Sequence, residues 1–408
     1  MPKPFCVTEF DESRLLHVQI YIENLGAFSK RIFVINFMAN GDKSMSDNAV
    51  KAERFHNIDL LKTIAIFFVV FYHGLIIKQN FLLEPSFETY FNFFVISILS
   101  TGVPLFFFCN GFLLFNKPLD LKKHIFKTIH LVIVTTIWAL LTIAIMMFTD
   151  GVRFTPLEFF KAFLDMRQNM IGYLWFMGAL VCIHILFPVL KGAFDSNKAS
   201  IFYMAIIAYI IPLGIMCIER VCSAIVHDAA GVYFKMFNPF SGLLAYSFMY
   251  FSLGGLACFY QDEIKQKIEE KHLNVKLIAF GAIIAACACL AVYGVLKSKK
   301  MNAVWDMVFA SYDSIFTLVN VLAIYLLSMN YRPKEGSAAA SAVCFIGANT
   351  LGIYLIHEIF LHILTKRLSE IAWCTNIIVN AVYCAAVICV CLAITWLIKK
   401  IPLVKHIL

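Results

Sequence analysis

The chain has 408 residues, of which 61% are hydrophobic and only 15% are charged. Soluble domains carry about a quarter charged residues, so this composition excludes an ordinary soluble protein and favours one built for lipid. The net charge of +8 comes from basic loops between apolar runs, which a membrane protein explains without a nucleic-acid partner.

Residues 1–52 form the only long polar stretch, and they lack the basic start, apolar core and cleavage site of a signal peptide. We expect a polar N-terminal extension that is poorly ordered over residues 1–44. Alternatively, translation starts at Met45 and the preceding residues are an artefact of the assigned start. Residues 53–408 are expected to form one integral-membrane domain.

About ten apolar runs are long enough to cross a hydrocarbon core of about 30 Å. Because lipid offers the backbone no hydrogen bonds, these runs must be helices, and the sequence predicts an all-α, polytopic membrane helix bundle. Lysines that follow the second, sixth and tenth runs place both termini in the cytoplasm by the positive-inside rule. The runs lie near residues 60–78, 92–115, 125–148, 172–190, 200–218, 240–260, 275–295, 304–329, 342–364 and 377–398.

The first run carries His73 inside its apolar stretch. An ionisable side chain there costs about 3 kcal/mol or more, so it usually faces the bundle interior or a wet cavity. Lys62 lies eleven residues earlier, so both side chains project from nearly the same face, about 16 Å apart. This arrangement suits an anionic substrate that enters from the cytoplasm. Alternatively, Lys62 reaches the lipid headgroups, Asp59 caps the helix and His73 is a buried structural residue.

Two further runs each carry a polar or amphipathic residue of interest. Asn110 lies among phenylalanines in the second run, where its amide must find a hydrogen-bond partner. Trp175 begins the fourth run, a position typical of the interfacial aromatic belt. His184, farther along that run, is expected to be a packing or polar-pair residue.

The eighth run holds Asp306, Asp313 and Asn320 at spacings of seven. On one helix, this spacing places all three on one face. Carboxylates facing lipid would be costly, so the face is predicted to line a polar cavity. We expect Asp313, the deeper acid, to share this cavity with His73.

The ninth run contains Asn349, His357, Glu358 and His362. His357 and Glu358 are adjacent, hence about 100° apart on a helix, and only one of them is expected to face the site. His357 and His362 are five residues apart, which suits joint metal ligation poorly. The chain shows no metal-ligand spacing, P-loop or G-x-S-x-G motif, so no metal site is predicted.

Four apolar motifs occur in a defined order. They read IDLLKTIAIFFVVFYH at 58–73, GVPLFFFCNGFLLF at 102–115, YLWFMGALVCIHILFPVL at 173–190 and LGIYLIH at 351–357. Together they resemble the membrane acyltransferase-3 family, the bacterial enzymes that O-acylate surface sugars, over roughly residues 55–400. The chain resembles the stand-alone form of the family, without a fused hydrolase-like domain.

This resemblance implies about ten membrane helices and an acyl-CoA donor, usually acetyl-CoA, with no permanently bound cofactor. The family's catalytic histidine corresponds to His73. Its basic residue eleven positions earlier, usually Arg, corresponds to Lys62, and its basic pair after the second helix corresponds to Lys127 and His130. Asn110 stands where the family usually has Ser.

The expected function is O-acyl transfer to a hydroxyl of a surface glycan or its lipid-linked precursor in the bacterial plasma (inner) membrane. His73 would act as a general base or carry the acyl group covalently, and Asp59 or Asp313 would orient it. Two alternatives remain open. One is a non-catalytic glycan exporter or flippase, and the other is an acyltransferase for a small secondary metabolite.

Overall fold

The computed structural model describes residues 54–74, 80–151, 153–159, 169–225, 245–334, 336–368, 371, 376–402 and 404–408. The chain divides into two units, Met1–Arg54 and Phe55–Leu408. The predicted N-terminal extension lies outside the described residues, so both explanations of it stay predictions. Everything below concerns the second unit.

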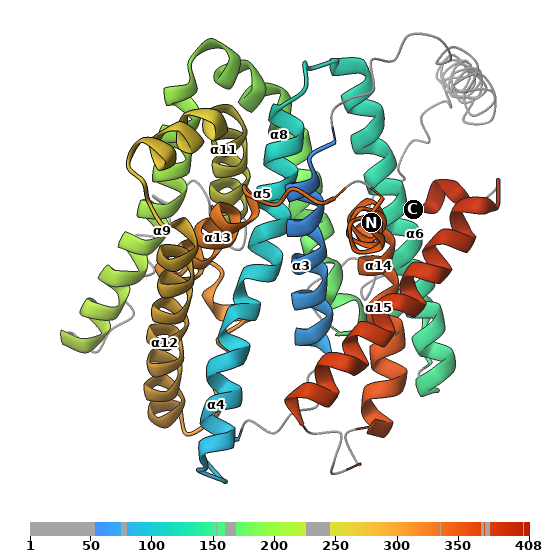
Figure 1. The fold of residues 1–408 in the computed structure, drawn as a ribbon. Helices are drawn as coiled ribbons and strands as arrows, with labels where there is room; N and C mark the ends of the chain where they lie inside the picture. Colours follow the sequence, from blue (N-terminus) through green and yellow to red (C-terminus); the bar gives the residue numbers. More distant parts are fainter. Residues whose placement is uncertain are drawn as a thin grey trace, which may run out of the picture. The chain divides into compact units, whose positions relative to one another are not determined.

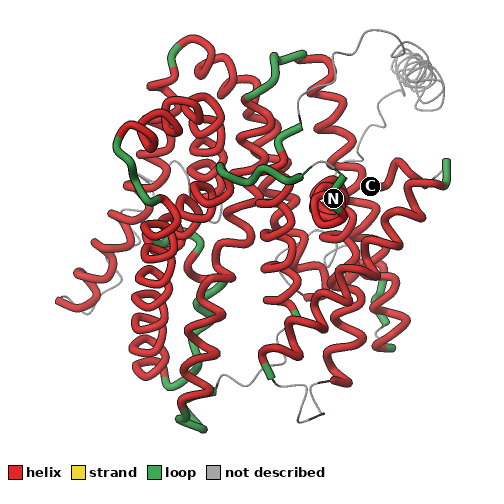
Figure 2. The backbone as a smooth tube through the Cα atoms, in the orientation of Figure 1, coloured by secondary structure: helices red, strands yellow, loops and turns green. Residues whose placement is uncertain are grey.

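The described part of this unit contains α-helices and short 3-10 turns, and no strand occurs in it (Figures 1 and 2). This confirms the all-α prediction. The α-helices are α3 (His56–His73), α4 (Phe87–Ile96), α5 (Gly102–Phe115), α6 (Leu121–Asp150), α8 (Trp175–Ser196), α9 (Lys198–Ile225), α11 (Ala245–Glu270), α12 (Val275–Met301), α13 (Ile315–Ser328), α14 (Ala338–Leu368) and α15 (Ile377–Lys400).

Six helical segments within the described ranges are long and apolar enough to cross a membrane, and two shorter apolar helices accompany them. The protein is therefore a multi-pass membrane protein. The count of ten spans stays a prediction. The six segments are Phe87–Phe115, Leu121–Asp150, Ile171–Ser196, Val275–Met301, Ala338–Leu364 and Ile377–Lys400.

The eighth predicted run, 304–329, is not one helix. Its first part is a turn, and α13 begins only at Ile315, where the Ser314 hydroxyl accepts a hydrogen bond from a backbone amide of the first turn. Asp306 Oδ1 likewise accepts hydrogen bonds from the backbone amides of Val308 and Phe309. Short polar side chains that satisfy nearby amides compete with helix formation. The predicted helical stripe of Asp306, Asp313 and Asn320 is therefore wrong.

Helix α3 lies among α5, α14 and α15 (Figure 1). Glycines permit the close approach on two sides: a Cβ on Gly102 of α5 would press on Phe68, and one on Gly347 of α14 would press on Asp59. Small residues at such contacts are the usual means by which membrane helices pack. This packing brings side chains of α5 and α14 next to both ends of α3.

Candidate active site

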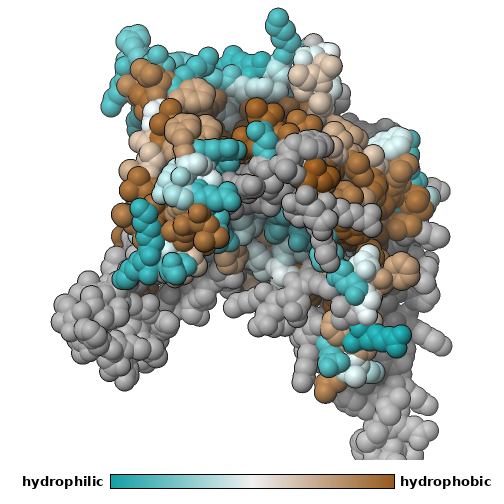
Figure 3. Space-filling view, turned by 90° about the horizontal axis from the view of Figure 1, so that it is seen from below, coloured by the Kyte–Doolittle hydropathy of each residue, from teal (hydrophilic) through white to brown (hydrophobic). Residues whose placement is uncertain are grey.

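His73 is the last residue of α3 and is followed by the C-cap Gly74. The sequence places it well inside an apolar run, but the helix stops there, so the imidazole lies at a helix end. Its side chain is 25% exposed and lines a cavity of about 210 Å³, here called the His73 cavity. Figure 3 views the molecule from this end, where both hydrophobic and hydrophilic residues reach the surface.

Aromatic side chains form much of the wall of the His73 cavity. Trp175, which the sequence suggested as an interfacial belt residue, belongs to this wall and stacks on Tyr312 with ring centroids 6.0 Å apart. Tyr72 also lines the cavity, and its hydroxyl donates a hydrogen bond of 2.5 Å to Asp306 Oδ2. Asp306 is thus tied to the cavity through Tyr72, although the helical stripe that suggested it does not exist.

Two residues of α14 converge on His73. His73 Nδ1 lies 3.1 Å from Glu358 Oε2, and the His73 and His357 rings meet edge to face with centroids 5.2 Å apart. The sequence led us to expect only one of His357 and Glu358 to face the site, but both do. Because α14 runs alongside α3, adjacent residues about 100° apart can contact one ring from two sides.

His357 is fully buried, and its two ring nitrogens have different surroundings. Nδ1 lies 2.6 Å from the carbonyl oxygen of Tyr354, which can only accept, so Nδ1 carries the proton. Nε2 then holds a lone pair, and it has no hydrogen-bond partner among the described residues.

Neither acid that the sequence proposed as an orienting group lies beside His73 in the structure. Asp59 is in the first turn of α3, fourteen residues and therefore about 21 Å along the helix from His73. Asp313 is exposed and does not line the His73 cavity. Glu358 is the carboxylate that contacts His73. Catalytic roles for Asp59 and Asp313 stay predictions without support from this geometry.

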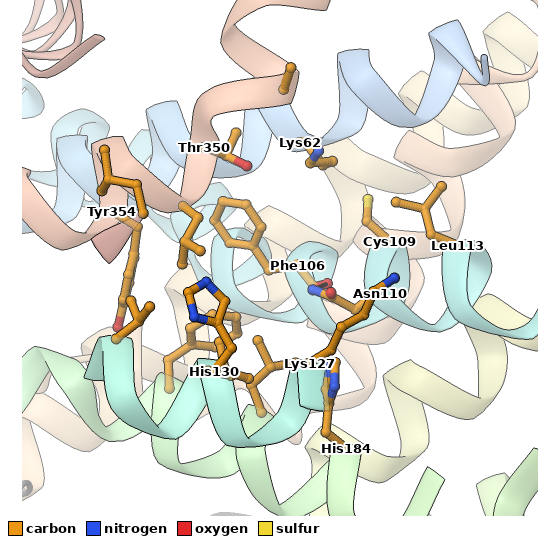
Figure 4. Close-up of a pocket in the computed structure, with 17 residues that line it drawn as sticks. Lys62, Phe106, Cys109, Asn110, Leu113, Lys127, His130, His184, Thr350 and Tyr354 are labelled. Atoms are coloured by element: carbon orange, nitrogen blue, oxygen red, sulfur yellow. Dashed lines mark hydrogen bonds between the residues drawn. The ribbon is translucent and has the colours of Figure 1, made fainter. Parts of the chain in front are cut away.

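A second cavity, of about 320 Å³, brings together the residues predicted to bind the donor. Lys62 of α3, Asn110 of α5, and Lys127 and His130 of α6 all line it (Figure 4). We call it the Lys62 cavity. Lys127 and His130 are also exposed at the surface, so the cavity opens on the α6 side.

Further polar residues surround the Lys62 cavity. Asn110 finds its partner within its own helix, donating to the Phe106 carbonyl at 2.8 Å. His184 lines the cavity, and its ring stacks on that of His124 with centroids 5.4 Å apart. Outside the residues that line the cavity, Lys399 of α15 donates to Asn349 of α14 at 2.8 Å.

The two cavities share part of their walls. Phe176 and Tyr354 line both of them, and their rings meet edge to face with centroids 5.2 Å apart. The Tyr354 hydroxyl donates to the backbone carbonyl of Tyr173, which holds its ring across the bundle. Sequence reasoning missed this aromatic wall because its members read as ordinary apolar packing residues.

The Acyl_transf_3 family model, described as an acyltransferase domain, matches residues 55–396. The chain belongs to this acyltransferase family. It is therefore an O-acyltransferase of the membrane, an enzyme that moves an acyl group other than an aminoacyl group from a donor to an acceptor. The match runs from the start of α3 almost to the end of α15 and includes every lining residue of the two cavities except Leu408. No curated protein and no solved structure matches the chain.

Proposed function

We propose that this acyltransferase moves an acyl group, in the first instance acetyl, from cytoplasmic acyl-CoA to a hydroxyl of a surface glycan or its lipid-linked precursor. The observation that carries the proposal is the pair of cavities on either side of one aromatic wall. One contains a histidine next to a carboxylate, and the other contains cations. The bacterial plasma (inner) membrane, with both termini in the cytoplasm, is the proposed location.

The Lys62 cavity is the proposed donor site. Lys62, Lys127 and His130 line it, and cationic donors form strong hydrogen bonds with phosphate oxygens. The Lys62 end of α3 is about 16 Å along the helix from His73. The pantetheine arm of CoA is long and flexible, and it carries the thioester past Phe176 and Tyr354 toward His73.

His73 is the proposed general base. Glu358 Oε2, 3.1 Å from Nδ1, favours the tautomer with its proton on Nδ1, and Nε2 is then free to take the proton of the acceptor hydroxyl. The hydroxyl oxygen attacks the thioester carbonyl, and the C–S bond then breaks. The CoA thiolate leaves and takes up the proton held by His73, so the enzyme returns to its starting state.

The experiment that tests the proposal follows labelled acetyl-CoA with the purified protein and lipid-linked glycan as acceptor. The expected product is glycan with label in an alkali-labile ester. Label that enters only a small hydroxylated metabolite would contradict the glycan acceptor. Accumulation of acetylated His73 with acetyl-CoA alone, seen by mass spectrometry, would replace the general base with a covalent intermediate.

Lys62→Ala is expected to weaken donor binding by about 10- to 100-fold, the range for losing a hydrogen bond to a charged group, whereas Lys62→Arg keeps most of the affinity. The measurement is acetyl-CoA affinity by calorimetry. Lys267→Ala is the matched control because Lys267 is exposed on α11 and pairs with Glu263 at 2.6 Å. Unchanged affinity in Lys62→Ala would show that Lys62 serves only lipid headgroups.

Glu358→Gln is expected to lower kcat by on the order of 10²-fold with little change in the KM for either substrate. The reason is that an amide cannot hold the imidazole in the charged, oriented state that a carboxylate supports. The measurement is steady-state kinetics together with donor affinity. A purely structural role would instead reduce donor affinity and folded yield along with kcat.

A further inference from the structure

We propose that His73, His357 and Glu358 form a binding site for a divalent transition metal, zinc in particular, whose occupation stops acyl transfer. The three residues each offer one ligand atom, and these atoms lie within 4.8 Å of one another. Two imidazole nitrogens, one carboxylate oxygen and an open fourth position are a common ligand set of zinc.

The unpartnered Nε2 of His357 is the second observation. A buried nitrogen with no hydrogen bond among the described residues requires an explanation. The other nitrogen donates to the Tyr354 carbonyl, which fixes the tautomer and leaves the Nε2 lone pair available to a ligand. A backbone carbonyl that holds the distal N–H of a histidine is the usual outer contact of a metal-bound imidazole.

The distances between the three ligand atoms need to change only slightly for zinc to bind. Tetrahedral zinc with bonds of about 2.0–2.1 Å places its ligand atoms roughly 3.3 Å apart. His73 Nδ1 and Glu358 Oε2 already lie 3.1 Å apart, and both side chains are 25% exposed. Modest rotations of these two residues bring them to the fixed nitrogen of His357. The His73 cavity gives access for the metal and space for a water as fourth ligand.

Inhibition follows from which nitrogen the metal takes. Zinc binds the Nδ1 lone pair of His73, so the single proton of the neutral ring must move from Nδ1 to Nε2. That imidazole has no lone pair to accept the hydroxyl proton of the acceptor. The inhibitory effect rests on the proposed role of His73 as general base, whereas metal binding itself does not.

The test uses purified full-length protein in detergent, stripped of metal with a chelator. Isothermal titration with Zn²⁺ is expected to give one site per chain, and Co²⁺ is expected to give the visible absorption of tetrahedral coordination. His357→Gln and Glu358→Gln should each bind at least about 100-fold more weakly. His362→Gln is the matched control because His362 is on the same helix but pairs with Asp150 at 2.8 Å.

Acyl transfer by the wild-type protein should fall to a small residual fraction when the site is saturated and recover after EDTA. Wild-type protein that binds no zinc, or folded variants that bind it normally, would overturn the site. Zinc that binds without slowing transfer would overturn the inhibition. Because His357 is fully buried, Glu358→Gln serves as the second ligand removal if His357→Gln does not fold. Binding is measured without donor or acceptor, so its outcome is independent of the proposed function.

Discussion

Replacing His73 with alanine is expected to lower the rate of acyl transfer by about 10²–10⁴-fold, the usual contribution of a general base. Among the described bases at this position, His73 lines the His73 cavity, whereas its neighbours His357 and Glu358 do not. The measurement is the rate of ester formation on the acceptor at saturating acetyl-CoA. Donor affinity should change little, because the cations that line the Lys62 cavity remain.

Two comparisons make this result specific to His73. His362→Gln alters another histidine next to a carboxylate, at a contact with Asp150, and should retain wild-type rates. His73→Ala must also show the elution profile and yield of the wild-type protein. Ester formation at the wild-type rate by folded His73→Ala would reject His73 as the catalytic group, whichever mechanism applies.

Replacing Gly111 or Gly254 with alanine is expected to destabilise the bundle by about 3 kcal/mol or more. A Cβ on Gly111 of α5 would collide with the Phe251 carbonyl, and one on Gly254 of α11 would collide with the Phe108 carbonyl. These obstacles are backbone atoms, so no rotamer change relieves them, and α5 and α11 must separate. The measurement is the midpoint of thermal unfolding in detergent together with the yield of monodisperse protein.

Gly281→Ala is the control for this pair. Gly281 lies within α12, and a Cβ there meets no atom within 4 Å. Alanine is favoured over glycine in helices by about 1 kcal/mol, so this variant should be as stable as the wild type or slightly more so. If Gly111→Ala and Gly254→Ala unfold at the wild-type temperature, the close α5–α11 contact is not formed as described. Loss of this contact would also shift Asn110 of the Lys62 cavity, since it precedes Gly111.

The sequence by itself determined where most helices lie and which motifs carry the family likeness. Hydrophobic length is a local property, so runs such as 125–148 and 377–398 closely foretold α6 and α15. The motif residues Lys62, Lys127 and His130, taken from the resemblance, do line one cavity. The prediction of one continuous helix over 304–329 was wrong, because composition does not reveal when Asp306 and Ser314 will bond backbone amides instead of continuing a helix.

Only the tertiary structure decided which groups surround His73. The sequence offered Asp59 and Asp313, but Glu358 makes the contact at 3.1 Å, and His357 packs on the same ring. His73 and Glu358 are 285 positions apart, and whether they meet depends on the rotation of α14 about its axis and on its position along α3. Close contacts at glycines, such as that of Gly347 with Asp59, set both. The aromatic wall of Phe176 and Tyr354 depends on the same helix registers. A periodic apolar pattern specifies neither the rotation nor the register of a helix, because many rotations bury similar surface at similar free energy.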